Sequence, residues 1–221
     1  MSSKQVSYGE EMRTVWAIAV TVLFFGASFG LLARAAGLGV LAPLVMSATT
    51  FAGSAQFAAA SILGTSGAVA AAIAAAVLLN VRYVPISISV ASLFRGPRLR
   101  RLAESQLIVD ESWALSSRGG GRFDRGLLIR AGLILYACWV GGTAVGVVGG
   151  SALGNPKDLG LDGAFPALFL ALLVPQLVDA RRRAAAFLGG AIALVLIPFT
   201  PPGVPIVAAS AACLLGLRAR S

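Results

Sequence analysis

The sequence predicts an all-α polytopic membrane protein of about seven transmembrane helices, forming two inverted repeats in which some helices are broken. Hydrophobic residues make up 57% of the 221 residues and charged residues only 12%, a composition outside the range of soluble domains. Apolar runs near the length of about 20 helical residues that crosses a bilayer core recur along the chain. Because they cover most of the sequence, we expect one membrane domain over residues 1–221.

Seven apolar runs account for the expected spans. They cover residues 15–35, 38–64, 67–94, 127–153, 163–179, 184–199 and 203–217. The runs are continuously apolar and rich in Ala, Gly and Leu, whereas the strands of a membrane barrel alternate polar and apolar residues. A polar connector, 95–126, separates a first half, 15–94, from a second half, 127–217.

A weak internal sequence similarity suggests how the two halves are related. The Gly-containing segment 24–30 in the first run resembles the segment 139–146 in the fourth. Three spans separate the two segments, and an odd number of spans would make one half upside down relative to the other. Glycines four residues apart in the fourth run indicate tight packing against another helix. They are Gly142, Gly146 and Gly150.

Most of the basic residues fall on one side of the expected membrane. The net charge is +9, which in a soluble protein would suggest a nucleic-acid partner. With seven spans, one side would hold Arg34, the arginines between Arg95 and Arg130, Arg181 to Arg183, Arg218 and Arg220. The other side would hold Lys4, Arg13 and Lys157. Because cytoplasmic loops are rich in Lys and Arg, we expect a cytoplasmic C-terminus and an external N-terminus. One re-entrant segment in the first half would reverse the N-terminus.

The second run, 38–64, is unusually polar for a buried span. Its central segment contains Phe51, Gly53, Ser54, Gln56 and Phe57. Pro43 and Gly53 weaken helical continuity, and the freed backbone groups would need side chains, water or a ligand as partners. A broken helix here would be a natural binding element. The alternative is a continuous helix whose hydroxyl groups bond their own backbone and whose Gln56 bonds to a neighbouring helix.

The third run places Asn80 and Arg82 at bilayer depth. An arginine at the centre of a span costs roughly 2.5–3.5 kcal/mol on insertion scales, so it usually faces a polar pathway or a partner. The planar guanidinium suits a carboxylate, and an amide oxygen accepts from an ammonium group. A zwitterionic amino acid would thus bind Arg82 by its carboxylate and the amides of Asn80 and Gln56 by its ammonium. The alternative is a structural Arg82 that bonds helix carbonyls or extends toward the interface.

The candidate substrate-binding set therefore combines polar groups with apolar walls. Its members are Gln56, Asn80, Arg82, Phe51, Gly53, Ser54, Phe57 and Trp139. Three acidic residues are candidates for proton coupling or a gate: Asp110, Glu111 and Asp162. Their alternative roles are solvated ion pairs for the first two and a helix N-terminus for Asp162.

Nothing in the sequence predicts an enzyme, a cofactor or a metal site. The chain contains no histidine, which removes His-dependent triads and most metal sites, and it has no Gly-rich phosphate loop with its lysine. Its two cysteines, Cys138 and Cys213, lie in apolar runs, where free cysteine behaves as a small hydrophobic residue.

Taken in order, five groups of residues resemble the AzlC family of branched-chain amino-acid permeases, the large subunit of LIV-E class exporters. They are Ser47 with 51–57, then 79–82, then 110–115, then Tyr136, Trp139, Gly141, Thr143, Gly146 and Gly150, then 159–162 with Phe165, Pro166, Ala167 and Phe169. One departure is visible, because the family commonly has His where this chain has Tyr83. A tyrosine has a pKa near 10, so a proton relay at Tyr83 is not expected.

The resemblance implies a multi-pass protein of the bacterial cytoplasmic (inner) membrane that exports branched-chain or other hydrophobic amino acids. It further implies coupling to an ion gradient and a small membrane subunit of the AzlD type as partner. Two alternatives remain at this point: a non-transporting membrane scaffold that stabilises a partner, and a transporter of a different small solute.

Overall fold

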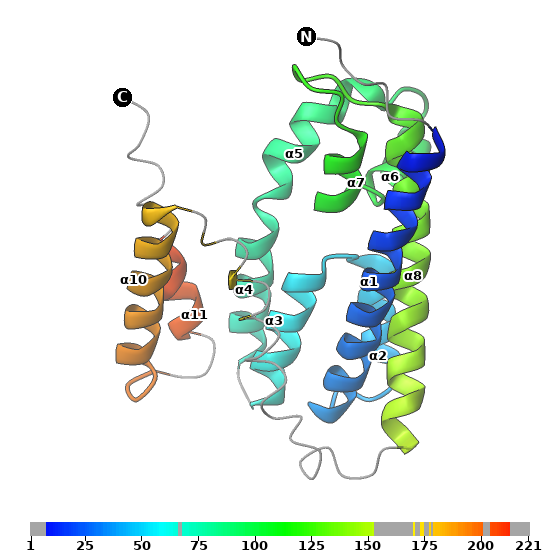
Figure 1. The fold of residues 1–221 in the computed structure, drawn as a ribbon. Helices are drawn as coiled ribbons and strands as arrows, with labels where there is room; N and C mark the ends of the chain where they lie inside the picture. The colour runs from blue at the N-terminus through cyan, green and yellow to red at the C-terminus, as the bar shows by residue number, and fades with distance from the viewer. Residues whose placement is uncertain are drawn as a thin grey trace.

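The computed structural model describes residues 8–65, 68–152, 170, 173–174, 177, 179–200 and 204–212. The elements within these residues are helices (Figure 1). They are α1 (Tyr8–Ala35), α2 (Leu41–Thr49), α3 (Gly53–Gly64), α4 (Val69–Asn80), α5 (Tyr83–Val90), the 3₁₀ turn η1 (Ala91–Leu93), α6 (Arg98–Ser105), α7 (Asp110–Ser116), α8 (Arg125–Ala152), α10 (Ala180–Leu196) and α11 (Val204–Ala209).

Two helices are each long and apolar enough to cross a membrane, namely α1 and α8. The pair Val69–Asn80 and Tyr83–Leu93 passes the same test together, although the two parts are bent by 41°. The described residues thus hold two spans, or three if the bent pair is one. The seven expected spans are not confirmed: run 163–179 lies almost wholly outside the described residues, while α10 and α11 cover parts of the last two runs.

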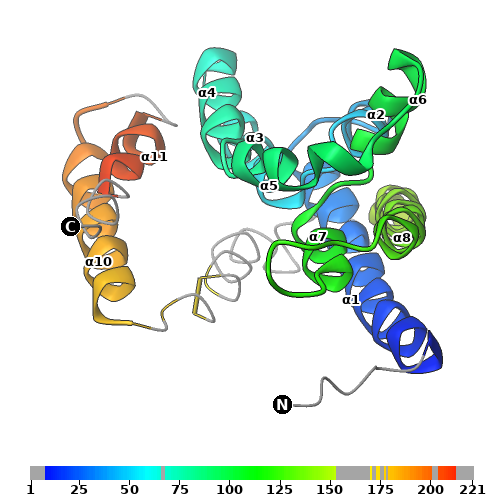
Figure 2. The ribbon, with the colours of Figure 1, turned by 90° about the horizontal axis from the view of Figure 1, so that it is seen from above.

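The helices α1 and α8 lie side by side and run in the same direction (Figures 1 and 2). A Cβ atom added at Gly26 would lie 2.5 Å from the Trp139 carbonyl oxygen, and one added at Gly146 would lie 2.0 Å from the Ala27 oxygen. Such backbone contact is the packing that small residues four apart allow. The two similar segments, 24–30 and 139–146, therefore run in the same direction, so their similarity does not correspond to an inverted repeat.

The run 38–64 is not one span but two short helices that enter and leave at the same end. α2 begins just after α1 ends, and at the close of α3 a Cβ added at Gly64 would lie 2.6 Å from the Ala36 Cβ. Between the two helices, Thr50, Phe51 and Ala52 interrupt the helix at mid-depth. This re-entrant hairpin settles the open alternative in favour of a broken helix.

The connector 95–126 forms a second hairpin, α6 and α7, that enters from the opposite end (Figure 1). Leu107, at its tip, is buried against Gly132, several residues into α8. The tip also meets the first hairpin, because the Gln106 side-chain amide donates a 2.8 Å hydrogen bond to the Thr49 carbonyl. The apolar tip residues 107–109 are buried there, which explains why this polar connector enters the protein.

The start of α1 lies at the same end of the molecule as the connector. Glu11 in the first turns of α1 forms an ion pair with Arg118, which follows α7. The expectation that the N-terminus and the connector lie on opposite sides is therefore wrong. The reason is the re-entrant α2–α3 hairpin, which removes one crossing from the first half.

Asp124 caps the N-terminus of α8 and gives a pH-dependent contribution to stability. Its carboxylate accepts a 3.0 Å hydrogen bond from the Leu127 N–H and pairs with Arg118 at 2.9 Å. Both contacts lower the pKa of the Asp124 carboxyl, the backbone bond most. A lowered pKa stabilises the folded state above the usual Asp range, near 3.9, and this stabilisation disappears as the pH falls through the folded-state value.

We expect Asp124→Ala to lower the free energy of unfolding at pH 7 by about 1 kcal/mol, the usual cost of losing an N-cap. The loss should shrink as the pH falls below about 4, since protonation weakens the same contacts in the unmodified chain. Thermal unfolding in detergent between pH 3 and 8 measures this difference. The control is Asp124→Asn, which keeps a cap but should make stability less pH-dependent; equal pH profiles for Asp and Asn would contradict the prediction.

Candidate functional site

A cavity of about 560 Å³ lies where the two hairpins meet the bent crossing. Its walls come from α1, both hairpin tips, the break between α4 and α5, and the middle of α8. The lining residues are Val22, Phe25, Phe51, Gly53, Ser54, Phe57, Arg82, Tyr83, Val109, Asp110, Glu111, Leu135 and Trp139. We call it the central cavity. Its volume is within the range of about 300–1,000 Å³ typical of small-molecule sites.

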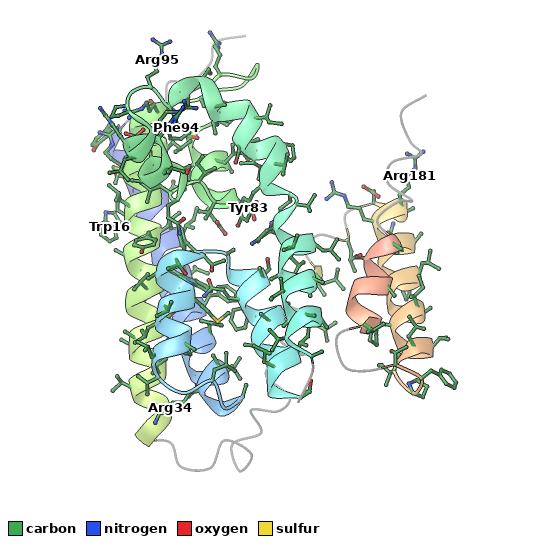
Figure 3. The ribbon with its side chains drawn as sticks, turned by 180° about the vertical axis from the view of Figure 1, so that it is seen from behind. Trp16, Arg34, Tyr83, Phe94, Arg95 and Arg181 are labelled. Carbon is green, nitrogen blue, oxygen red and sulfur yellow. The ribbon has the colours of Figure 1, made fainter. Side chains whose placement is uncertain are left out.

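Tyr83 marks the depth of the central cavity. Figure 3 shows it at an intermediate level between Arg95, near one end of the molecule, and Arg34, near the other. The chain breaks there because α4 ends at Asn80 and α5 begins at Tyr83. Broken helices at mid-depth expose backbone groups and helix ends where a substrate could bind, and membrane proteins tolerate them where they line a cavity.

One side of the central cavity is aromatic. The rings of Phe57 and Trp139 lie edge to face with centroids 6.3 Å apart, and the fully buried Phe29 contacts both from behind. A Cβ at Gly53 would lie 2.9 Å from the Trp139 ring, so the glycine makes room for the indole. This wall can bind an apolar side chain.

The orientation of Trp139 is fixed by a buried hydrogen-bond network centred on Gln56. The Gln56 Oε1 accepts from the Trp139 indole N–H at 3.1 Å and from the Ala52 N–H at 3.2 Å. Its amide group donates to the Ser47 hydroxyl at 3.1 Å, which lies 2.8 Å from the Thr143 hydroxyl. An indole N–H can only donate, so the oxygen of Gln56 must face it.

The opposite side of the central cavity is polar and contains Arg82. Its guanidinium donates to the Ser54 hydroxyl and pairs with the Asp110 carboxylate, both at 3.0 Å. It also lies over the Tyr83 ring, 5.3 Å from the centroid. The Arg82 side chain is 45% exposed, so it is not buried in the apolar interior as its position in the third run suggested.

Two helix ends add partial charges beside Arg82. The first N–H groups of α3, from Gly53 and Ser54, lack partners within the helix, and the N-terminus of a helix carries a partial positive charge. Asn80 ends α4, where the partial charge is negative, and its side-chain Oδ1 is buried without a hydrogen-bond partner among the described residues. The site thus offers an anion position at α3, whereas the Asn80 acceptor at the end of α4 lies outside the cavity lining.

The tip of the first hairpin is strained. Phe51 has φ +44°, the one positive value among the described non-glycine residues. Such a conformation costs roughly 1–3 kcal/mol and concentrates at functional sites. The ring of Phe51 lines the central cavity and packs edge to face on Tyr136, whose hydroxyl donates to the Ala48 carbonyl at 2.7 Å. The strain places an aromatic ring in the site.

The structure brings most of the residues named from the sequence to one place. The central cavity contains Phe51, Gly53, Ser54, Phe57, Arg82, Trp139, Asp110 and Glu111. Gln56 and Asn80 do not line it: Gln56 is 1% exposed behind Trp139, and Asn80 stands at the helix break. Asp162 lies outside the described residues.

Sequence reasoning missed five lining residues: Val22, Phe25, Tyr83, Val109 and Leu135. One of them could have been found, because Leu135 lies four residues before Trp139 on the same helical face. Val109 gave no local signal, since only the fold of the connector brings it to the cavity.

We expect Gln56→Leu to destabilise the protein although the two side chains are similar in size. The substitution leaves the buried Trp139 N–H and the Ala52 N–H without their acceptor, and an unsatisfied buried polar group costs about 1–3 kcal/mol. Thermal unfolding measures this, with Gln106→Leu as control because that amide makes one hydrogen bond at an exposed site. Equal losses for the two variants would show that the network has no special role.

Comparison with known proteins places the chain among membrane proteins. The family model described as "AzlC protein" matches residues 17–153. An uncharacterized membrane protein of Archaeoglobus fulgidus is 35% identical over 191 residues, which cover 84% of this chain and 82% of that protein. The branched-chain amino acid transport protein AzlC of Bacillus subtilis is 27% identical over 170 residues, covering 76% of this chain and 66% of that protein. No solved structure matches the chain.

The matched range coincides with the site. Residues 17–153 contain the whole lining of the central cavity, from Val22 to Trp139, together with both hairpins and the Gln56 network. The family model therefore covers the part of the fold that builds the cavity. The chain belongs to the AzlC family.

Proposed function

We propose that this chain is the transport subunit of a secondary exporter that moves branched-chain or other hydrophobic amino acids out of the cytoplasm. One observation carries the proposal. In a chain of the AzlC family, the central cavity combines an aromatic wall with an arginine and a helix N-terminus. A hydrophobic amino acid has a matching division into an apolar side chain and a charged end.

The chemistry of binding follows from this division. The substrate carboxylate would bind Arg82 and the N–H groups at the start of α3, where both the full and the partial positive charge are located. The ammonium group would approach the C-terminal end of α4, where the helix carries a partial negative charge. The unpartnered Oδ1 of Asn80 is buried outside the cavity lining, so it could accept a hydrogen bond from the ammonium group only after turning toward the cavity. The side chain would pack against Phe51, Phe57 and Trp139. Gln56 would act as a positioning residue for Trp139.

The Arg82–Asp110 pair gives a basis for gating and ion coupling. Asp110 already occupies one position on the guanidinium, so a substrate carboxylate would compete with it. Protonation of Asp110, or of its neighbour Glu111, would remove negative charge from this side of the central cavity and free Arg82 for substrate. Because Asp110 lies at the start of α7, its release would also loosen the contact between the second hairpin and the α4–α5 break.

The distribution of arginines supports one orientation in the membrane. The connector holds Arg95, Arg98, Arg100 and Arg101, so by the positive-inside rule it would be cytoplasmic. The start of α1 lies at the same end through Glu11 and Arg118 and would be cytoplasmic as well. We further propose that the chain lies in the cytoplasmic membrane of a bacterium, with a cytoplasmic C-terminus and further spans in residues 153–217. A small AzlD-type membrane subunit would be its partner.

Efflux from intact cells tests the proposed function. Cells that express the chain, with and without its candidate small subunit, are preloaded with radiolabelled leucine, alanine or lysine. Selective and faster loss of leucine supports an exporter of hydrophobic amino acids, and dependence on the second chain supports an obligate complex. Equal retention of all three amino acids, with the protein present in the membrane, would favour a scaffold or a different solute.

A further inference from the structure

Glu111 is a carboxylate of the central cavity that makes no ion pair within the described part of the chain. It lies in the first turn of α7, directly after Asp110, and its exposed side chain lines the cavity. Asp110 pairs with Arg82 at 3.0 Å. Of the two neighbouring acidic residues, Glu111 is therefore the one whose carboxylate is available to a ligand.

The charges that line the central cavity do not balance. Arg82 contributes one positive charge, and Asp110 and Glu111 contribute one negative charge each when both are ionised. The other lining residues carry no charge. A ligand ammonium group would remove the excess of negative charge. A ligand carboxylate would add to it and would also have to displace Asp110 from Arg82. The ammonium is thus the charged end that the cavity accepts more easily.

Glu111 also lies on the side of the cavity where the ammonium group of an amino acid would bind. Figure 1 shows that α7 reaches toward the junction of α4 and α5, and there the charge of Glu111 acts on both Arg82 and Tyr83. The C-terminal end of α4 adds a partial negative charge at the same junction. A carboxylate away from bulk water is costly without a cation, and a nearby ammonium group would supply the missing charge.

The rest of the cavity suits an apolar group attached to that ammonium. Val109 directly precedes the two acidic residues, and Leu135 and Trp139 of α8 belong to the same lining. A ligand that places its ammonium group at Glu111 can therefore pack an apolar chain against the aromatic wall. The ligand class indicated by this arrangement is an amine with a compact apolar chain.

We propose that Glu111 binds the ammonium group of the ligand in the central cavity and makes this group, rather than the carboxylate, the one that the site requires. The inference rests on the proposed function, because it takes the central cavity as the substrate site. It gives the two charged ends of an amino acid separate partners: Arg82 for the carboxylate, in competition with Asp110, and Glu111 for the ammonium. Apolar acids without an amine are then poor ligands.

Binding of two fragments of leucine to the purified full chain tests this assignment. Isoamylamine keeps the side chain and the ammonium group of leucine, whereas isocaproate keeps the side chain and the carboxylate. Isothermal titration calorimetry in a neutral detergent measures the affinity for each. We expect isoamylamine to bind about 10- to 100-fold more tightly than isocaproate, the range that a hydrogen bond to a charged group supplies.

Glu111→Gln separates this role from a structural one, because it should change the two affinities differently. We expect the variant to bind isoamylamine about 10- to 100-fold more weakly. It should bind isocaproate at least as well as the unmodified chain, since one negative charge has been removed. Glu111→Asp, which keeps the charge, should recover part of the isoamylamine binding. The matched control is Glu10→Gln, the same change in the first turn of α1 and outside the cavity lining, which should leave both affinities unchanged.

The proposal is overturned if isocaproate binds as tightly as isoamylamine, if neither fragment binds, or if Glu111→Gln weakens both fragments equally. Leucine efflux from cells is a separate result. If isoamylamine binds through Glu111 while cells retain leucine, the exporter proposal fails and the ammonium site stands. If leucine is exported but isoamylamine binding does not depend on Glu111, the exporter proposal stands and the role of Glu111 is refuted.

Discussion

Replacing Arg82 with glutamine is expected to reduce leucine export by about 10- to 100-fold while the protein still folds and reaches the membrane. The reason is the loss of a charged hydrogen-bond donor in the central cavity, where it faces Ser54 and Asp110. Hydrogen bonds to charged groups contribute about 1.5–3 kcal/mol, which corresponds to this range. Folding should survive because the side chain is 45% exposed and its pair with Asp110 is not deeply buried.

The matched control for this experiment is Arg34→Gln, the same chemical change at one end of the molecule and outside the central cavity (Figure 3). It should export at the normal rate. Arg82→Lys should recover part of the activity, because lysine keeps the charge but not the planar pair of donors. If Arg82→Gln exported leucine normally at equal expression, Arg82 would not bind the substrate carboxylate, and its pair with Asp110 would be structural.

Substitution of Gly146 by alanine is expected to disrupt the pairing of α1 with α8, the packing that supports the aromatic wall. The new Cβ would lie 2.0 Å from the Ala27 carbonyl oxygen and 2.9 Å from the Leu31 nitrogen. Both are backbone atoms, so the overlap can be relieved only if the two helices separate. Overpacking of this kind costs about 1–3 kcal/mol or more. A lower thermal midpoint and a loss of monodisperse protein in size-exclusion chromatography would show it.

Gly149 provides the control, since it lies on the same helix but a Cβ there meets no atom within 4 Å. The same Gly→Ala change at position 149 should leave the thermal midpoint nearly unchanged. The pair of variants separates close helix contact from any general effect of glycine on helix stability. If Gly146→Ala were as stable as Gly149→Ala, the close contact between α1 and α8 would not contribute to stability.

The sequence by itself determined the class of this protein and much of its site. Continuous apolar runs predicted membrane helices because a helix satisfies its own backbone groups in lipid. Residues that are costly or unusual in such runs, above all Arg82 and the segment around Gly53, are brought together at the central cavity, and their role in transport stays a prediction. The spacing of Gly142 and Gly146 predicted close packing, and the contacts with α1 confirm it.

Topology and the pairing of residues were decided only by the tertiary structure. Apolar length does not distinguish a span from a hairpin that turns back, so the sequence predicted one crossing where α2 and α3 form a hairpin. The expectation that the N-terminus and the connector lie on opposite sides was wrong as a consequence. The composition of the connector likewise did not predict that the α6–α7 tip enters the protein, because most of the connector is polar and only residues 107–109 are buried. The partners of Gln56 lie far away along the chain, at Trp139 and Ser47. Hydrogen bonds and ion pairs act over a few ångströms in space, and the sequence does not state which distant residues the fold brings that close.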